Sequence, residues 1–323
     1  MYSIGIDLGG TIIKIGLVHT GKIIGYKAFV SISRKGLKAS LPYIEEVVNQ
    51  LLNEENIEVS QLSGIGLAFP GIVDPVNKTV VSTNEKYDDA QQIDFPAWIS
   101  KKWDVPLYMD NDARMAVLGE WKYGAGKGYN NVVMMTIGTG IGTGVIIDGN
   151  VLYGAHFQAG SLGGHFVVDY KSRRCSCGNI GCVEALSSSS FLCKIIQDHK
   201  GVSDTFRKMA DTIDFKQIFQ LAEKGEKDAL CISNHCMDIW AAAIITYIHA
   251  YDPEVVILGG GVMKSSQMII PYLKKRVDER AWCPSGKVKL VVSSLGDSTA
   301  LLGAEQGIIA TNSKSYKTKF TCL

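Results

Sequence analysis

Thr136-Ile137-Gly138-Thr139-Gly140-Ile141-Gly142-Thr143-Gly144 is the stretch that decides the fold of this chain. The apolar run from Val132 to Met135 precedes it and Val145-Ile146-Ile147 follows it, so one strand enters the loop and another leaves it. Alternating glycines let backbone N–H groups turn toward one point, and the threonine hydroxyls add donors, which is how a chain holds a phosphate group. A plain glycine-rich β-hairpin is the alternative interpretation, because tight hairpin turns also favour glycine.

Two other nucleotide-binding motifs are absent. A Rossmann fingerprint requires G-x-G-x-x-G at the start of a helix, and a Walker loop requires Gly-Lys followed by Ser or Thr. Gly126-Lys127 is followed by Gly128, so neither pattern occurs.

Composition limits the class of protein. With 323 residues and 46% hydrophobic residues, the chain is long enough for about two globular domains. Lys and Arg number 33 against 32 for Asp and Glu, so nothing attracts the chain to nucleic acid or to an anionic membrane. The start of the chain lacks a signal sequence, and no apolar run approaches membrane-spanning length, which predicts a cytoplasmic protein. In that compartment the eight cysteines are expected to be thiols or metal ligands.

The start of the chain predicts an antiparallel meander, with strands over 3–7, 12–18 and 22–30. Asp7 ends the first strand, and the turn and second strand after it supply Gly9, Gly10, Thr11 and Lys14. Taken alone, this is an ordinary hairpin with a turn aspartate. Together with the second Gly/Thr loop, this turn predicts a site that binds the phosphate groups of a nucleotide from two sides. Asp7 would bind Mg²⁺ directly or through water.

Further elements follow from hydrophobic periodicity and from turn residues. Pro70-Gly71 ends the strand at 65–69, either as a plain exit turn or with Gly71 contacting a ligand. Residues 84–92 are polar and are expected to form a loop. The other expected elements are helices over 41–53, 95–103, 113–123, 237–250 and 268–277, and strands over 105–109, 255–258 and 288–293.

Asp110-Asn111-Asp112 joins a predicted strand to a predicted helix, where Asp or Asn is a good N-cap. A catalytic role is also open, in which Asp112 accepts the proton of an attacking hydroxyl and Asn111 hydrogen-bonds a neighbouring hydroxyl of the substrate. Asp112 is preferred to Asp110 because the last aspartate opens the helix, and adjacent strand side chains point to opposite faces.

Cys175, Cys177 and Cys182 lie within eight residues, broken by glycines, and His165 precedes them by ten. This Cys₃His set is typical of a closed, structural zinc site. The alternative is buried or disulfide-bonded cysteine, which is less usual in a cytosolic chain.

Asp7-Leu8-Gly9-Gly10-Thr11, the second Thr/Gly loop and Leu258-Gly259-Gly260-Gly261-Val262 resemble the motifs of the sugar kinase, actin and heat-shock-protein ATPase superfamily. The cysteine segment narrows the resemblance to the ROK family of repressors, open reading frames and sugar kinases. The resemblance spans nearly the whole chain, up to Gly296–Ala304.

This resemblance implies ATP and Mg²⁺ at residues 7–11 and at the second loop, a sugar beside the proposed base, and the adenosine near the triple glycine. The site residues thus predicted are Asp112 as base; Asn111, Gly71, Ser161, His165 and Glu184 for the sugar; and Asp7, Gly9, Gly10, Thr11, Lys14, Thr136, Gly138, Thr139, Gly140, Gly259, Gly260 and Gly261 for the nucleotide.

One segment departs from the family pattern. ROK sugar kinases usually carry Gly-Glu-x-Gly-His before the zinc cysteines, with the Glu touching the sugar. This chain has Gly160-Ser161-Leu162-Gly163-Gly164-His165, so the Glu is missing and a glycine is inserted. Ser161, Gln158 or His156 would have to replace it, and the identity of the sugar stays open.

The sequence therefore predicts an α/β protein of ribonuclease-H-like, actin-type fold, with two domains and a cleft between them. Residues 1–114, joined by a helix over 298–311, would form the small domain, and 115–297, with the zinc loop 165–182, the large one. The expected activity is ATP-dependent transfer of a phosphoryl group to a hexose hydroxyl, and the family suggests a homodimer. A sugar-binding or regulatory protein without kinase activity is the alternative. A repressor is disfavoured, because only six residues precede Asp7.

Overall fold

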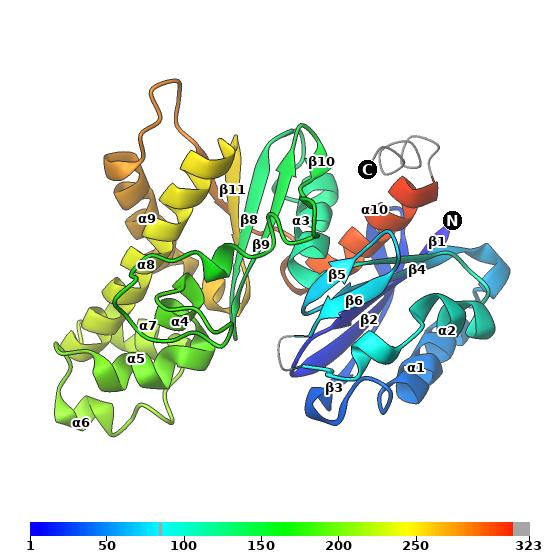
Figure 1. Ribbon diagram of the computed structural model, residues 1–323, viewed down its shortest axis with the longest axis horizontal. Helices are drawn as coiled ribbons and strands as arrows, with labels where there is room; N and C mark the ends of the chain where they lie inside the picture. The colour runs from blue at the N-terminus through cyan, green and yellow to red at the C-terminus, as the bar shows by residue number, and fades with distance from the viewer. Residues whose placement is uncertain (84–85, 313–323) are drawn as a thin grey trace. The chain divides into compact units, whose positions relative to one another are not determined.

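The structure is a computed structural model that describes residues 1–83 and 86–312 (Figure 1). The chain divides into two compact units. The first contains residues 1–128, 151–159 and the chain from 294 onward, and the second contains 129–150 and 160–293. The first unit extends beyond the predicted boundary at residue 114, up to Gly128, because α3 (Asp112–Tyr123) packs against α10 (Thr299–Asn312).

The first unit is built on a five-stranded sheet with the order β3-β2-β1-β4-β7. The first three strands pair antiparallel, which confirms the predicted meander, and β4 and β7 continue the sheet in parallel. The strands of this unit are β1 (Tyr2–Leu8), β2 (Ile12–His19), β3 (Lys22–Val30), β4 (Leu62–Phe69), β7 (Leu107–Asn111) and the separate pair β5 (Ile72–Asp74) and β6 (Thr79–Ser82).

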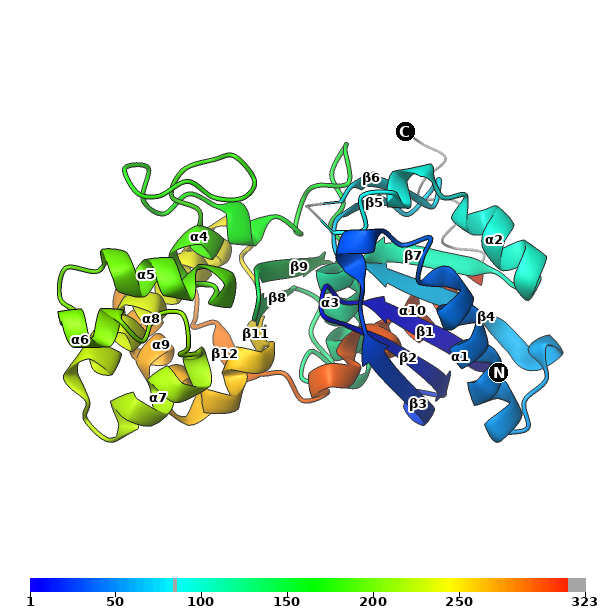
Figure 2. The ribbon, with the colours of Figure 1, turned by 90° about the horizontal axis from the view of Figure 1, so that it is seen from below.

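Helices cover the two faces of this sheet differently (Figure 2). On one face, α1 (Leu41–Glu54) and α2 (Phe95–Lys102) bury a continuous apolar core that includes Ile44 and Phe95. On the other face, α10 lies directly on the strands, because Gly5, Gly16 and Gly66 present no side chain there. A Cβ atom at Gly5 would come within 2.9 Å of the backbone of α10. Glycine at these positions therefore sets the close packing of helix on sheet.

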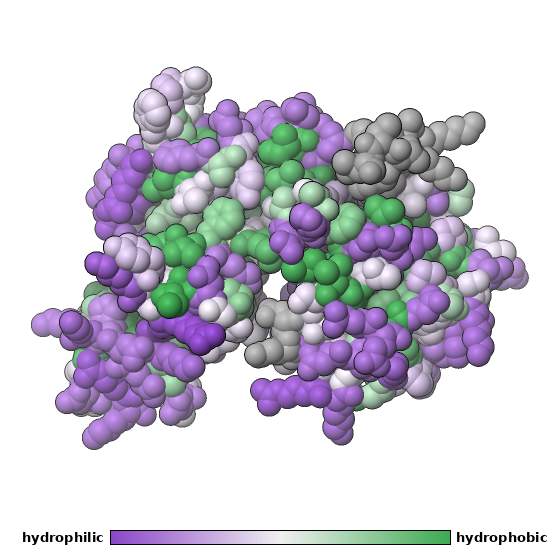
Figure 3. All heavy atoms as spheres, in the orientation of Figure 1, coloured by the Kyte–Doolittle hydropathy of each residue, from purple (hydrophilic) through white to green (hydrophobic). Residues whose placement is uncertain are grey.

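The second unit repeats the same topology. Its sheet has the order β10-β9-β8-β11-β12, in which β8 and β9 form an antiparallel hairpin and β11 and β12 add in parallel. The strands are β8 (Val132–Ile137), β9 (Ile141–Ile147), β10 (Asn150–Val151), β11 (Val255–Gly259) and β12 (Lys289–Val292). The helices are α4 (Val183–Ser187), α5 (Leu192–Asp198), α6 (Asp204–Arg207), α7 (Phe215–Glu223), α8 (Lys227–Tyr251) and α9 (Ser266–Arg280). On the face seen in Figure 3, the surface over α5 and α6 is mainly hydrophilic.

Helix α8 begins ten residues before the predicted start at Met237, because the side chain of Glu226 caps it by accepting from the N–H of Ala229. At 25 residues it is long and apolar enough to cross a membrane, which the sequence reading did not anticipate. Half of its most apolar window is buried inside the fold, and Trp240 and Tyr247 on it are fully buried. A helix in the core of a globular protein can be equally long and apolar, so these two properties alone are weak evidence for a membrane span.

The last helix begins within one residue of the predicted start at 298. Asp297 lies in a 3₁₀ turn just before α10 begins at Thr299, and its carboxylate pairs with Lys14 at 2.9 Å. Residues 313–323 fall outside the described residues.

Candidate active site

The first Gly/Thr turn lies at the end of β1. Asp7 pairs with Lys14 across the β1–β2 ladder, and the Lys14 Nζ atom lies 4.0 Å from Asp7 Oδ2. Gly9 has no room for a side chain, because a Cβ atom there would collide with the carbonyl oxygen of Ile12. Gly9 and Gly10 carry no side chains of their own, which lets the backbone of this turn approach a phosphate group closely.

Asp7 carries an unusual charge state. Burial, and then the charge of Asp112, raise the pKa of Asp7 to about 7, although Lys14 opposes the shift. A carboxylate that is desolvated beside a second carboxylate favours a bound cation, because a cation offsets both penalties. Asp7 therefore suits a role as ligand for a hard divalent ion.

Asp112 begins α3 and is held in place by its neighbours. The Asn111 Nδ2 atom donates to Asp112 Oδ1 at 3.0 Å, and the N–H of Ala113 donates to the same oxygen at 2.8 Å. Asn111 is the N-cap of α3, and its Nδ2 atom also donates to the carbonyl of Gly71 at 2.9 Å. Burial raises the pKa of Asp112, while the charge of Lys86 opposes this shift. Asn111 and Gly71 therefore position the carboxylate of Asp112.

Asp110 is fully buried and fully engaged elsewhere. The hydroxyls of Tyr108 and Tyr153 donate to its Oδ2 atom at 2.9 and 2.8 Å, and Arg114 lies 3.5 Å from Oδ1. Both side chains of this ion pair are 0% exposed. Asp110 therefore has a structural environment, which favours Asp112 as the residue available to a substrate.

Arg114 also holds a strap of the chain, which we define as residues 151–159. Its Nη2 atom donates to the carbonyls of Phe157 and Ala159, both at 2.8 Å, and its guanidinium lies 4.8 Å from the ring centre of Tyr153. Because of these contacts, the strap belongs to the first unit although the residues on both sides belong to the second.

The second Gly/Thr loop is the β8–β9 hairpin of the second unit, and it is braced from two sides. The N–H of Ile141 donates to Glu184 Oε2 at 2.8 Å, and Ser189 and Ser190 donate their N–H groups to the carbonyls of Gly138 and Thr139. Glu184 is predicted to contact the sugar. In the structure its Oε2 atom accepts a hydrogen bond from this hairpin.

The triple glycine meets the same hairpin. Gly259 lies opposite Thr136 in the β8–β11 register, and Gly260 has a φ of 90°. A Cβ atom at Gly260 would collide with the carbonyl oxygen of Ile137. Segments more than a hundred residues apart in sequence thus lie side by side as one Gly-rich surface.

Residues 160–165 pack on β9 through Thr143. The Thr143 hydroxyl donates to the carbonyl of Gly160 at 2.8 Å and accepts from the N–H of Gly163 at 2.8 Å. A side chain at Gly164 would collide with the carbonyl of Ile141, which explains the Gly-Gly pair at 163–164. Ser161 lies in this loop, half-buried.

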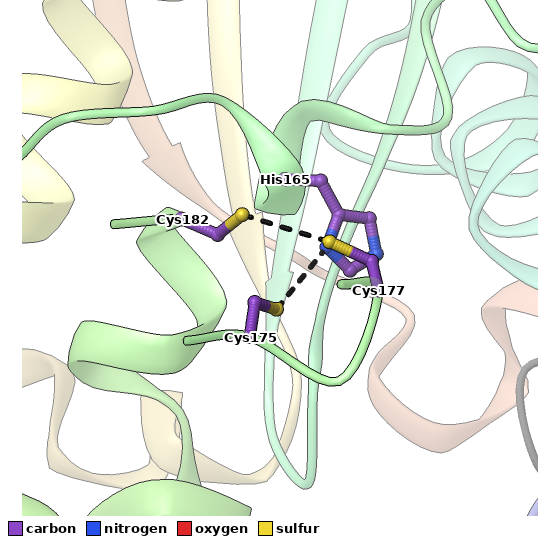
Figure 4. A group of neighbouring side chains, drawn as sticks. All are labelled: His165, Cys175, Cys177 and Cys182. Atoms are coloured by element: carbon purple, nitrogen blue, oxygen red, sulfur yellow. Dashed lines mark hydrogen bonds between the residues drawn. The ribbon is translucent and has the colours of Figure 1, made fainter. Parts of the chain in front are cut away.

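His165, Cys175, Cys177 and Cys182 converge, as predicted (Figure 4). Their ligand atoms all lie within 4.8 Å of one another, with 3.6 Å between Cys175 Sγ and His165 Nδ1 and 3.7 Å between Cys177 Sγ and Cys182 Sγ. A tetrahedral zinc ion with Zn–S distances of about 2.3 Å separates its ligand atoms by roughly 3.7 Å. Burial and the neighbouring thiols raise the pKa of Cys182, so a cation would be needed to hold three thiolates together. The donor set therefore fits zinc.

Sequence reasoning missed three residues that shape the site: Lys86, Arg114 and Thr143. Lys86 follows a short polar stretch and matches no motif, so no signal pointed to it. Arg114 sits four residues after Asp110, the spacing of a helical ion pair, which was a usable signal.

A repeated five-stranded sheet, with a Gly/Thr hairpin in each copy, defines the actin-like ATPase fold, the fold of the sugar kinase superfamily. Within that class, the model of the ROK family matches residues 3–309. The chain belongs to the ROK family.

Individual relatives include both enzymes and regulators. The glucokinase of Thermotoga maritima is 31% identical, over 93% of this chain and 95% of that protein. The xylose repressor of Bacillus subtilis is 28% identical, over 95% of this chain and 77% of the repressor. Among solved structures, the ROK hexokinase of Thermus thermophilus matches with a TM-score of 0.76 and 25% identity, covering 95% of this chain and 97% of that one.

Proposed function

We propose that this protein is an ATP-dependent sugar kinase that transfers the γ-phosphoryl group of ATP to a hexose hydroxyl. The 6-hydroxyl of glucose is the first candidate acceptor, and an N-acetylhexosamine is the second. The observation that carries the proposal is the placement of Asp112 beside the Asp7 turn within one unit, close enough for its charge to raise the pKa of Asp7. A base beside a phosphate-binding turn is the arrangement that phosphoryl transfer to a hydroxyl needs.

In this proposal Asp112 accepts the proton of the attacking hydroxyl. Asn111 and the N–H of Ala113 hold the carboxylate oxygen that stays in place, so the second oxygen is left for the substrate. Orientation and proton removal are what a sugar hydroxyl requires to become a nucleophile. Ser161 and His165 are the proposed sugar contacts on the second unit, together with the free oxygen of Glu184.

The nucleotide is proposed to use both Gly/Thr turns, with its phosphates at Gly9, Gly10 and Thr11 and at the β8–β9 hairpin. The adenosine would lie beside Gly259–Gly261, where the backbone carries no side chains. Lys14, already paired with Asp297, would add positive charge near the phosphates.

Two metals belong to the proposal. Asp7 would hold Mg²⁺, which supplies neutralising charge on the phosphates when bound. His165, Cys175, Cys177 and Cys182 would hold a structural Zn²⁺ that fixes the loop carrying His165.

A coupled assay for ADP release over a panel of hexoses, pentoses and N-acetylated hexosamines tests the activity. We expect turnover with at least one hexose, and a fall of about 10²–10⁴-fold in kcat for Asp112→Asn. Asp104→Asn, which changes an exposed aspartate of the same unit, serves as the matched control. If Asp112→Asn keeps full turnover, Asp112 is not the base.

A sugar-responsive regulator without kinase activity is the second candidate. The similarity to a xylose repressor over 95% of this chain favours it, as does the absence of Glu at the Gly160–His165 segment. Calorimetric binding of a sugar, with no ADP release on any member of the panel, would select this alternative.

A further inference from the structure

Lys86 lies against the first phosphate turn. It is half-buried, and the end of its side chain covers Gly10. A Cβ atom built at Gly10 would lie 2.9 Å from Lys86 Cε and 3.4 Å from Lys86 Nζ. The ammonium group is therefore next to the backbone that is proposed to bind the nucleotide phosphates.

The next residue fixes this position. Tyr87 is fully buried, and its hydroxyl donates to the carbonyl of Gly9 at 2.9 Å while it hydrogen-bonds Ser31 Oγ at 2.7 Å. Its N–H donates to the carbonyl of Ser33 at 3.0 Å, and Ser33 Oγ donates to the carbonyl of Gly10 at 2.8 Å. The backbone at Lys86 is thus tied to both glycines of the turn.

Tyr87 also has a left-handed backbone, with a φ of 57°. A non-glycine residue in that region costs on the order of 1–3 kcal/mol, and such strain gathers at functional sites. The buried ring and the three hydrogen bonds of Tyr87 hold this conformation directly after Lys86.

The described acidic side chains do not pair with the Lys86 ammonium group. Lys14, the other cation at the turn, is paired with Asp297 at 2.9 Å. Within residues 1–83 and 86–312, no carboxylate oxygen lies within 4.0 Å of the Lys86 Nζ atom. Its charge still reaches Asp112, because it opposes the rise of the pKa of that group. Among the described residues, Lys86 therefore has no ion-pair partner; its ammonium group lies beside the phosphate turn, and its charge acts on the proposed base.

We propose that Lys86 is a catalytic residue of this enzyme and that its ammonium group binds the phosphoryl group in transfer. The inference rests on the proposed kinase function. In the step concerned, a bond forms between the sugar oxygen and the γ-phosphorus, and the bond from that phosphorus to the β,γ-bridging oxygen breaks. The hydroxyl proton passes to Asp112 and ADP leaves, while Lys86 stays protonated. Lys86 contributes a positive charge that is already in position where negative charge develops in the transition state.

Three variants test this role, assayed by ADP release with the best sugar of the panel. Lys86→Met keeps the aliphatic stem and removes the charge, Lys86→Arg keeps the charge, and Lys38→Met removes an exposed lysine of the same unit as a control. For Lys86→Met we expect kcat to fall about 100-fold, with the KM for the sugar changed less than about threefold. We expect Lys86→Arg to recover at least a tenth of the wild-type kcat, and Lys38→Met to match the wild type.

The outcomes separate the two proposals. If the wild-type protein phosphorylates a sugar and Lys86→Met keeps kcat within about threefold, Lys86 is not catalytic and the kinase proposal stands. If the wild-type protein releases no ADP with any sugar, the kinase proposal fails and this inference fails with it. A loss of activity in Lys86→Met and Lys86→Arg alike, accompanied by an equal loss of folded protein in thermal unfolding, would make the role structural and overturn the assignment.

Discussion

Replacing Arg114 by Met should destabilise the first unit by about 3 kcal/mol. The change leaves Asp110 as a buried carboxylate without its ion-pair partner, and breaking a buried pair in this way costs about 3–5 kcal/mol. It also removes the donors to the carbonyls of Phe157 and Ala159. We expect the lower end of that range for two reasons. The Arg114–Asp110 distance is 3.5 Å, and the Nε atom of Arg114 has no hydrogen-bond partner among the described residues.

Urea unfolding followed by circular dichroism measures this effect. With a slope of about 3 kcal/mol per molar urea, a loss of about 3 kcal/mol moves the midpoint down by about 1 M. Limited proteolysis gives an independent readout, because the strap at 151–159 loses two of the hydrogen bonds that hold it and should be cut first.

The double variant Asp110→Asn/Arg114→Met provides the control. It removes the charge that the single variant leaves unpaired, so it should be more stable than Arg114→Met alone, with a coupling of about 1–3 kcal/mol between the two sites. A midpoint shift below about 0.3 M for Arg114→Met, or a double variant less stable than the single one, would refute the importance of the buried pair.

Three further predictions concern the metal site, pH and the hairpin. The purified protein should contain about one zinc per chain by atomic absorption; Cys177→Ser should lose it with a lower Tm, whereas Cys283→Ser, outside the cluster, should retain it. In protein free of metal and nucleotide, Asp7 binds a proton in the folded state up to about pH 7 and in the unfolded state only to about pH 4, so its contribution to stability is lost as pH rises through that window. The free energy of unfolding should fall by up to about 1.4 kcal/mol per pH unit there, and Asp7→Asn should flatten the profile; an unchanged slope would contradict the assignment. Gly140→Ala places a methyl group 2.5 Å from the carboxylate that braces the hairpin and should cost about 1–3 kcal/mol in thermal unfolding, whereas Gly138→Ala, which meets nothing within 4 Å, should cost less than about 1 kcal/mol.

Much of the fold could be predicted because its strongest signals are local. Alternation and glycine marked the strands of the first meander, which the structure confirms as β1, β2 and β3. The closely spaced cysteines converge with His165 because the glycines between them allow a compact loop. The ROK resemblance, carried by the Gly/Thr turns and the cysteine segment, is confirmed by the family match.

The remaining features depend on contacts that sequence spacing does not encode. The strap at 151–159 belongs to the first unit only because Arg114, buried in α3, hydrogen-bonds its carbonyls. Lys86 reaches Gly10 because the next residue, the buried Tyr87, donates its hydroxyl to the carbonyl of Gly9, which is distant in sequence. The polar residues at the start of α8 concealed its first ten positions, since capping by Glu226 rather than hydrophobic periodicity begins that helix.

The close seat of α10 on Gly5, Gly16 and Gly66 has a consequence for biosynthesis. Strands made at the beginning of translation keep one bare face until residues 299–312 have left the ribosome, because only that helix fits so close to them. Contacts of such large sequence separation slow folding and prolong the exposure of nascent sheet. Ribosome-stalled chains ending before residue 299 should therefore recruit chaperones more strongly than chains that include it.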